Sequence, residues 1–161
     1  MNIRLKADEF VFQVEPGEPL NDWFDGKICL SSPIMGENFR LQTEVYCPFE
    51  NWLKLCDWLE AHIQTLKSNA NNLTFVQSYT WTPLDTGMTF TCLEGEVDDK
   101  DGEFEGGFGL RIMVKVFAPD FDAYVYSGLE GEVEIHEAIA FCQTLREYVN
   151  SQTAVLVGVS G

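Results

Sequence analysis

Basic residues are scarce in this sequence of 161 residues. Ten lysines and arginines stand against 26 aspartates and glutamates, which gives a formal net charge of −16 at pH 7. The field of so acidic a molecule repels phosphate backbones and anionic lipid headgroups. The composition therefore argues against direct binding to nucleic acid or to a membrane surface.

Long apolar runs are also missing. No segment approaches the roughly 18 apolar residues that would indicate a membrane span. Residues 1–9 reach Asp8 and Glu9 before the apolar core of a signal peptide can develop. We expect a cytoplasmic protein.

Histidine and paired cysteine, the usual ligands of transition metals, are sparse. The only histidines, His62 and His136, lie 74 positions apart, and no C-x-x-C pair occurs. We therefore expect no metal and no cofactor. Each of the five cysteines sits among hydrophobic neighbours, which is typical of reduced thiols in a core. They are Cys29, Cys47, Cys56, Cys92 and Cys142.

Motifs for catalysis or for calcium are not found. The sequence has no G-x-S-x-G turn, and its carboxylates are too many for a catalytic pair to be identified from spacing. If Gly102 is aligned with the central glycine of an EF-hand loop, Val97 and Phe108 fall on two ligand positions. We expect a protein that is not an enzyme.

What the chain does contain is enough apolar material for one folded domain over residues 1–161, since 45% of its residues are hydrophobic and 13% aromatic. Apolar residues recur at helical spacing over two ranges, approximately 49–67 and 132–150. In the first range they form one face that runs from Trp52 through Leu59 to Leu66. His62 lies at the edge of this face, where a partly buried structural histidine is expected.

Alternating or apolar runs predict strands in the rest of the chain. Turn residues separate these runs, and 110–117 followed by 121–126 is typical of an antiparallel hairpin. The predicted fold is α+β, with one antiparallel sheet of about six or seven strands packed by the two helices. The runs are 10–14, 27–30, 39–46, 73–81, 88–93, 110–117 and 121–126. The apolar tail 154–159 is expected to add a short strand or to fill a groove.

Acidic residues are concentrated between residues 94 and 137, where thirteen acids and three bases give a net charge of −10. One interpretation is a solvated hairpin loop whose charges maintain solubility. The other is a surface that faces a basic protein. The candidate partner-binding acids are Glu94, Glu96, Asp98, Asp99, Asp101, Glu103 and Glu105. Trp58, which lies off the centre of the first helix's apolar face, is either a second packing contact or an exposed anchor for the partner.

Several features follow one another along the chain: Asp22-Trp23-Phe24-Asp25, the strand 39–46, a helix that opens Phe49-Glu50-Asn51-Trp52-Leu53 and continues to Asp57-Trp58-Leu59-Glu60, and the strands 73–81 and 88–93. Their order resembles that of the WapI-type immunity proteins of bacterial toxin systems. The resemblance covers roughly residues 20–126, and the acidic segment after Leu93 and the apolar tail depart from it. It implies a non-catalytic protein that binds and blocks a toxin, typically a nuclease.

Three hypotheses for the function remain open at this point. The first is an immunity protein that neutralises a toxin, probed by whether its gene follows a toxin gene. The second is a phage-encoded nucleic-acid mimic that inhibits a host antiviral defence complex, whose gene would lie in a prophage. The third is a small carboxylate-dependent enzyme, which needs a cleft holding an acid with a raised pKa.

Overall fold

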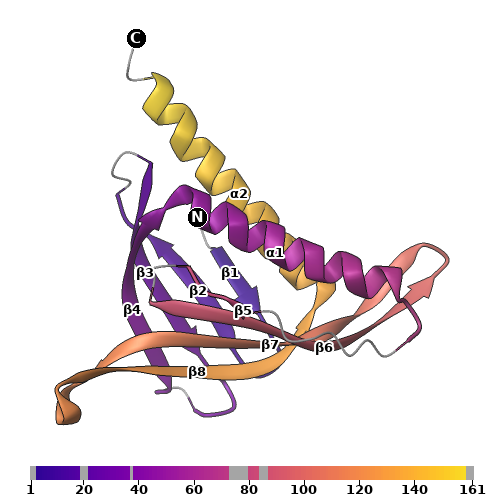
Figure 1. Cartoon of the computed structure of the whole chain (residues 1–161), viewed down its shortest axis with the longest axis horizontal. Helices are drawn as coiled ribbons and strands as arrows, with labels where there is room; N and C mark the ends of the chain where they lie inside the picture. Colours follow the sequence, from indigo (N-terminus) through magenta and orange to yellow (C-terminus); the bar gives the residue numbers. More distant parts are fainter. Residues whose placement is uncertain (1–2, 19–21, 37, 73–79, 84–86, 159–161) are drawn as a thin grey trace.

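The computed structural model describes residues 3–18, 22–36, 38–72, 80–83 and 87–158. It confirms the α+β class, with two helices and antiparallel strands throughout. The prediction of one sheet was wrong, because the described strands form two separate four-stranded sheets, in the orders β1-β2-β3-β4 and β5-β6-β7-β8. Figure 1 shows both helices lying over the sheets, with α1 and α2 side by side.

The first sheet is a simple meander. Its strands are β1 (Ile3–Lys6), β2 (Val11–Pro16), β3 (Trp23–Ser31) and β4 (Arg40–Pro48). Each strand pairs with the next in antiparallel register. β1 was not predicted, since four residues of which two are charged give too short an alternation to recognise. Helix α1 (Phe49–Ser68) follows β4 directly, with Pro48 at its N-cap.

The second sheet contains the long strands. It consists of β5 (Thr80–Trp81), β6 (Met88–Lys100), β7 (Glu103–Ala118) and β8 (Ala123–Glu134), with a short 3-10 helix, η1 (Pro119–Phe121), between β7 and β8. The predicted hairpin is confirmed, although all its strands are longer than expected. Most of the predicted strand 73–81 lies outside the described residues.

The second helix begins and ends later than predicted. Helix α2 (Ile135–Gly158) starts three residues after the predicted position, because Glu132 and Glu134 belong to β8. It also continues through residues 154–158 of the apolar tail, so the expectation that the tail 154–159 adds a short strand was wrong for these residues. Residue 159 lies outside the described part.

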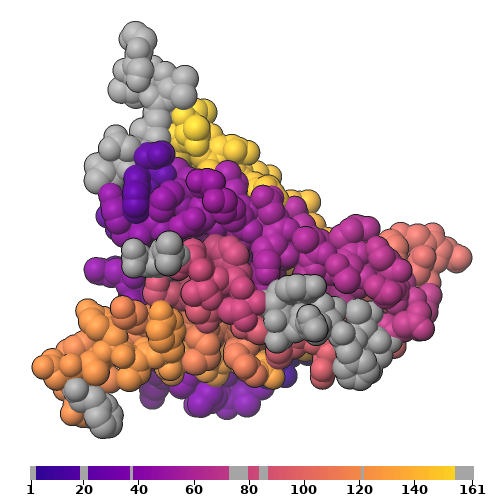
Figure 2. Space-filling view, viewed as in Figure 1, coloured from indigo at the N-terminus to yellow at the C-terminus, as the bar shows by residue number. Residues whose placement is uncertain are grey.

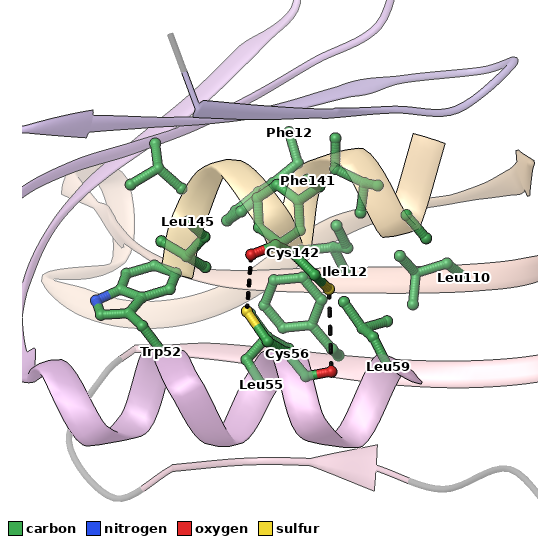
Figure 3. Close-up of a cluster of buried hydrophobic side chains, with 14 of the residues drawn as sticks. Phe12, Trp52, Leu55, Cys56, Leu59, Leu110, Ile112, Phe141, Cys142 and Leu145 are labelled. Carbon is green, nitrogen blue, oxygen red and sulfur yellow. Dashed lines mark hydrogen bonds between the residues drawn. The ribbon is translucent and has the colours of Figure 1, made fainter. Parts of the chain in front are cut away.

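One hydrophobic core joins the two sheets to the two helices. The Phe12 ring of β2 packs edge-on against Phe90 of β6, at 5.2 Å between ring centroids, and against Phe141 of α2, at 6.1 Å. Trp52, Leu55 and Leu59 of α1 point into the same cluster (Figure 3). Because every layer contributes to this cluster, neither sheet has a core of its own.

Two cysteines mark the place where the helices cross. The Cys56 thiol of α1 lies 3.7 Å from the carbonyl oxygen of Cys142 in α2, and the Cys142 thiol lies 3.9 Å from that of Cys56 (Figure 3). Beside them, the Arg146 guanidinium donates to Asp57 at 2.8 Å and to Glu60 at 2.7 Å. Small buried thiols and a two-carboxylate clamp therefore hold α2 against α1.

The five cysteines as a group behave as the sequence predicted. All five are buried and free. Burial raises the pKa of the Cys47 thiol to about 12, and it raises the pKa of Cys92 as well. These thiols are therefore protonated packing groups at neutral pH. Among the described helices, none combines the length and apolar character needed to cross a membrane.

The position of Leu59 gives a direct test of α1 as a central support. Its side chain is fully buried, so Leu59→Ala should lower the free energy of unfolding by about 2 to 5 kcal/mol through lost burial and cavity formation. Gln64→Ala, on the exposed side of the same helix, should change it by about 0.5 kcal/mol or less. Urea unfolding of the two variants measures the difference, and equal values would show that α1 does not pack through this face.

Candidate functional site: an acidic hollow on the second sheet

The acidic segment is a hairpin of two strands. Residues 94–100 continue β6 and residues 103–105 begin β7, so the interpretation as a loop was wrong. Only Asp101 and Gly102 form the turn, with φ of 57° and 92°. Positive φ at both central residues is the geometry of a type I′ turn, whose twist matches that of paired strands. The carboxylates are therefore attached to an ordered backbone.

The end of α1 holds this hairpin in place. The Asn71 N–H donates to the Val97 carbonyl at 2.8 Å, and the Asp99 N–H donates to Asn71 Oδ1 at 3.2 Å. The Lys67 ammonium lies 4.9 Å from the centre of the Phe104 ring. Figure 2 shows the hairpin tip projecting beside the C-terminal end of α1. One face of the hairpin is thus anchored, and the other is free.

Strand alternation places most of the acids on the free face. Val97 and Phe108 point into the core, so Glu96 and Asp98 of β6 and Glu105 of β7 point outward. The register between β6 and β7 shifts between Cys92 and Gly95. Two residues, Leu93 and Glu94, stand there opposite Gly109, which is the arrangement of a β-bulge. Glu94 is consequently exposed.

These acids border a hollow of about 520 Å³ on the outer face of the second sheet, called here the acidic hollow. Glycines form much of its floor, and β8 contributes two further glutamates. The residues that line it are Leu93, Glu94, Gly95, Glu96, Asp98, Glu105, Gly106, Gly107, Phe108, Gly109, Glu130 and Glu132.

The strand register explains how the glycine floor separates the charges. Gly107 pairs with Glu96 of β6 on one side and with Glu134 of β8 on the other. At two strand spacings, the backbones of these glutamates are about 10 Å apart. A Cβ at Gly107 would lie 2.6 Å from the Val133 carbonyl oxygen, so no larger residue fits without a backbone shift. The floor between the two rows of acids therefore carries no side chain at this point.

Few cations neutralise the acidic hollow. Lys100 pairs with Glu105, and Arg111 pairs with Glu130 at 2.6 Å. Within the described part of the chain, Glu94, Glu96, Asp98 and Glu132 have no ion-pair partner. Asp98 stands directly opposite Glu105, and Lys100 offsets their repulsion, because it pairs with Glu105 and also interacts electrostatically with Asp98. The surface thus has free acceptor capacity for Lys or Arg side chains of another molecule.

The structure brings together four of the predicted site residues and separates the other four. Glu94, Glu96, Asp98 and Glu105 line the acidic hollow. The remaining acids lie at or next to the turn, where the Asp99 carboxylate accepts the Gly102 N–H at 2.8 Å and Asp101 and Glu103 are exposed. Trp58 lies elsewhere, on α1.

The sequence analysis missed the contribution of β8. Glu130 and Glu132 line the acidic hollow and Glu134 lies beside it, whereas the sequence analysis had included Glu132 and Glu134 in the predicted helix 132–150. The signal was present in the segment Glu130-Gly131-Glu132-Val133-Glu134, whose strict alternation has the period of a strand.

Trp58 belongs to a smaller, separate hollow. Its ring is half-buried against the core, which favours the packing interpretation, and it lines a space of about 270 Å³ with Ala61, His62 and Thr65. His62 is 4% exposed, and its ring packs edge-on against Phe108 at 4.8 Å. Neither of its ring nitrogens has a hydrogen-bond partner among the described residues. Burial lowers the pKa of His62 to about 4.

His62 should make the protein acid-sensitive in a defined pH window. The unfolded chain binds a proton near pH 6.5 and the folded protein only near pH 4, so stability is full above 6.5 and falls as the pH drops from 6.5 to 4. The loss should reach about 3 kcal/mol. His62→Leu should remove this part of the pH dependence in urea unfolding at several pH values.

His136 offers the matched control for this experiment, since its side chain is 73% exposed. His136→Gln should follow the wild type at every pH. If the wild type and His62→Leu lose stability in parallel between pH 6.5 and 4, the buried imidazole does not carry the effect.

Comparison with known proteins assigns no function to the acidic hollow. No protein family matches the sequence, and no curated protein is similar enough to count as a relative. Among the residues that the structure describes, no three His, Cys, Asp or Glu side chains are grouped so that they could hold a metal ion.

Proposed function

We propose that this protein is a non-catalytic binding protein that captures a basic protein on the acidic hollow. The observation that carries the proposal is the double row of carboxylates across a glycine floor, with four of them lacking an ion-pair partner among the described residues. Like charges held side by side cost folding free energy, and such departures from the rules of stable sheets concentrate at functional surfaces.

The proposed partner follows from the electrostatics. A net charge of −16 steers basic molecules toward this protein, and a fixed backbone lets the carboxylates meet Lys and Arg side chains without prior ordering. Gly107 contributes no side chain between Glu96 and Glu134, and the Glu132 carboxylate lies 3.3 Å from the position that a Cβ of Gly107 would take, so a basic side chain that reaches this point meets a carboxylate. A nuclease, whose substrate-binding surface is basic, has the chemistry that such a surface complements.

The resemblance to WapI-type immunity proteins supports a biological role for this binding. We infer that the protein acts in the cytoplasm and neutralises a nuclease toxin by covering its active or nucleic-acid-binding surface. This role requires no catalytic group in the protein itself. The basic partner should therefore lose its activity on nucleic acid in a stoichiometric complex.

Charge reversal in the acidic hollow tests the proposal. The triple variant Glu94→Lys, Glu96→Lys, Asp98→Lys should slow association with the partner recovered by co-purification by one to three orders of magnitude at low salt. It should also flatten the salt dependence of the association rate. Stopped-flow measurement over a range of salt concentrations gives both quantities.

A second triple variant controls for total charge. Glu18→Lys, Glu44→Lys, Glu147→Lys changes the net charge by the same amount at exposed positions outside the acidic hollow. It should bind much faster than the first variant. Equal association rates for the two variants would show that net charge alone governs binding and would contradict a localised site.

A further inference from the structure

Strand β8 lies at the edge of the second sheet, and only part of that edge is covered. Its partner on one side is β7. Near its C-terminal end, the Asp8 N–H donates to the Glu132 carbonyl at 3.0 Å, and the Glu132 N–H donates to Glu9 Oε2 at 2.9 Å. The turn between β1 and β2 thus closes the edge at Glu132.

The rest of the edge is open. Both backbone groups of Glu132 point away from β7, and in an antiparallel pair this direction recurs at every second residue. The amides and carbonyls of Tyr124, Tyr126, Gly128 and Glu130 therefore point the same way. Among the described residues, they make no hydrogen bond on that side. The side chains of Tyr124 and Tyr126 are 66% and 53% exposed.

The sequence of this open edge lacks the usual protection against another strand. Residues 123–129 contain no charge and no proline, whereas natural edge strands are commonly blocked by lysine, proline or a covering loop. In β8 both the covering turn and the charged residues lie at the C-terminal part of the strand. The turn contacts Glu132, and the charged residues are Glu130, Glu132 and Glu134. An uncharged, exposed and unpaired strand edge is a surface on which an extended peptide can pair.

We propose that residues 124–130 of β8 accept an extended segment of the basic partner as an additional strand. This inference rests on the proposed function, because the partner's positive charge comes from it. A second copy of this chain would bring another net charge of −16 to the same edge, so a basic segment is the better complement.

The side chains beside the edge specify the segment further. The Lys115 ammonium lies 4.8 Å from the centre of the Tyr124 ring, so a cation of the protein itself already occupies this ring. Tyr126 and Glu130 stand on the same outer face, at alternate positions of β8. An added strand with Lys or Arg at every second residue would place cations beside the Tyr126 ring and the acidic hollow.

Two synthetic octapeptides test strand addition without the natural partner. Both alternate lysine and threonine and have blocked ends, and the second also carries N-methyl groups on its four central amides, which removes backbone donors but no charge. The first should slow amide exchange at Tyr124, Tyr126 and Gly128 in NMR and bind at least tenfold more tightly than the second. Equal binding of the two peptides, or unchanged exchange at these amides, would overturn the proposal.

A pair of substitutions at one position gives an independent test. Tyr126→Pro and Tyr126→Ala both remove the ring, but only proline removes the outward N–H, and neither touches a hydrogen bond to β7. The proline variant should bind the first octapeptide several-fold more weakly than the alanine variant, with a similar Tm. Equal affinity for this octapeptide would contradict strand addition.

The outcomes separate this inference from the proposed function. If the two octapeptides bind equally and the Glu94, Glu96 and Asp98 reversal weakens both, the acidic hollow recognises basic chains and β8 takes no part. If the reversal changes neither while the methylated peptide still binds more weakly, the edge acts alone and the electrostatic site is wrong.

Discussion

The contact of Phe12 with Phe90 and Phe141 is the constraint on which the rest of the structure depends. Through it, two sheets that share no backbone ladder and two helices bury their apolar faces in one cluster. Since both sheets contribute to one cluster, the strands of the second sheet alternate so that Phe90, Leu110 and Ile112 face inward, and the alternation of β6 is interrupted only at its β-bulge. The outer face of these strands then takes no part in the core.

Because the outer face of the second sheet lies outside the core, the protein tolerates many carboxylates on this surface. The acids near the hairpin tip are exposed, while Val97 and Phe108 hold the same strands against α1 and the core. Core-facing apolar residues and solvent-facing acids therefore alternate along a single strand. The site is acidic without being flexible, because Asn71 and Lys67 at the end of α1 fix the inner side of the hairpin.

The sequence predicted those elements whose pattern is local. The apolar face of α1, the hairpin of 110–117 with 121–126 and the buried thiols were all identified, since periodicity and neighbours suffice for them. The division into two sheets was not predicted, because alternation shows that a strand has a buried face but does not show which strand it pairs with.

The acids at 94–105 suggested a loop, since their charge concealed the inward positions of Val97 and Phe104. Glu132 and Glu134 were wrongly included in the second predicted helix, because glutamates also favour the first turn of a helix. The grouping of β6, β7 and β8 around Gly107 depends on register, which composition does not encode.

The central claim is that the outer face and open edge of the second sheet bind a basic protein. Hydrogen–deuterium exchange of the complex with the co-purified partner tests it most directly, because it maps the interface without any substitution. Protection is predicted in residues 94–107 and 124–134, with little change on the exposed side of α1. Protection centred on α1 around Trp58, with the second sheet unchanged, would contradict the claim.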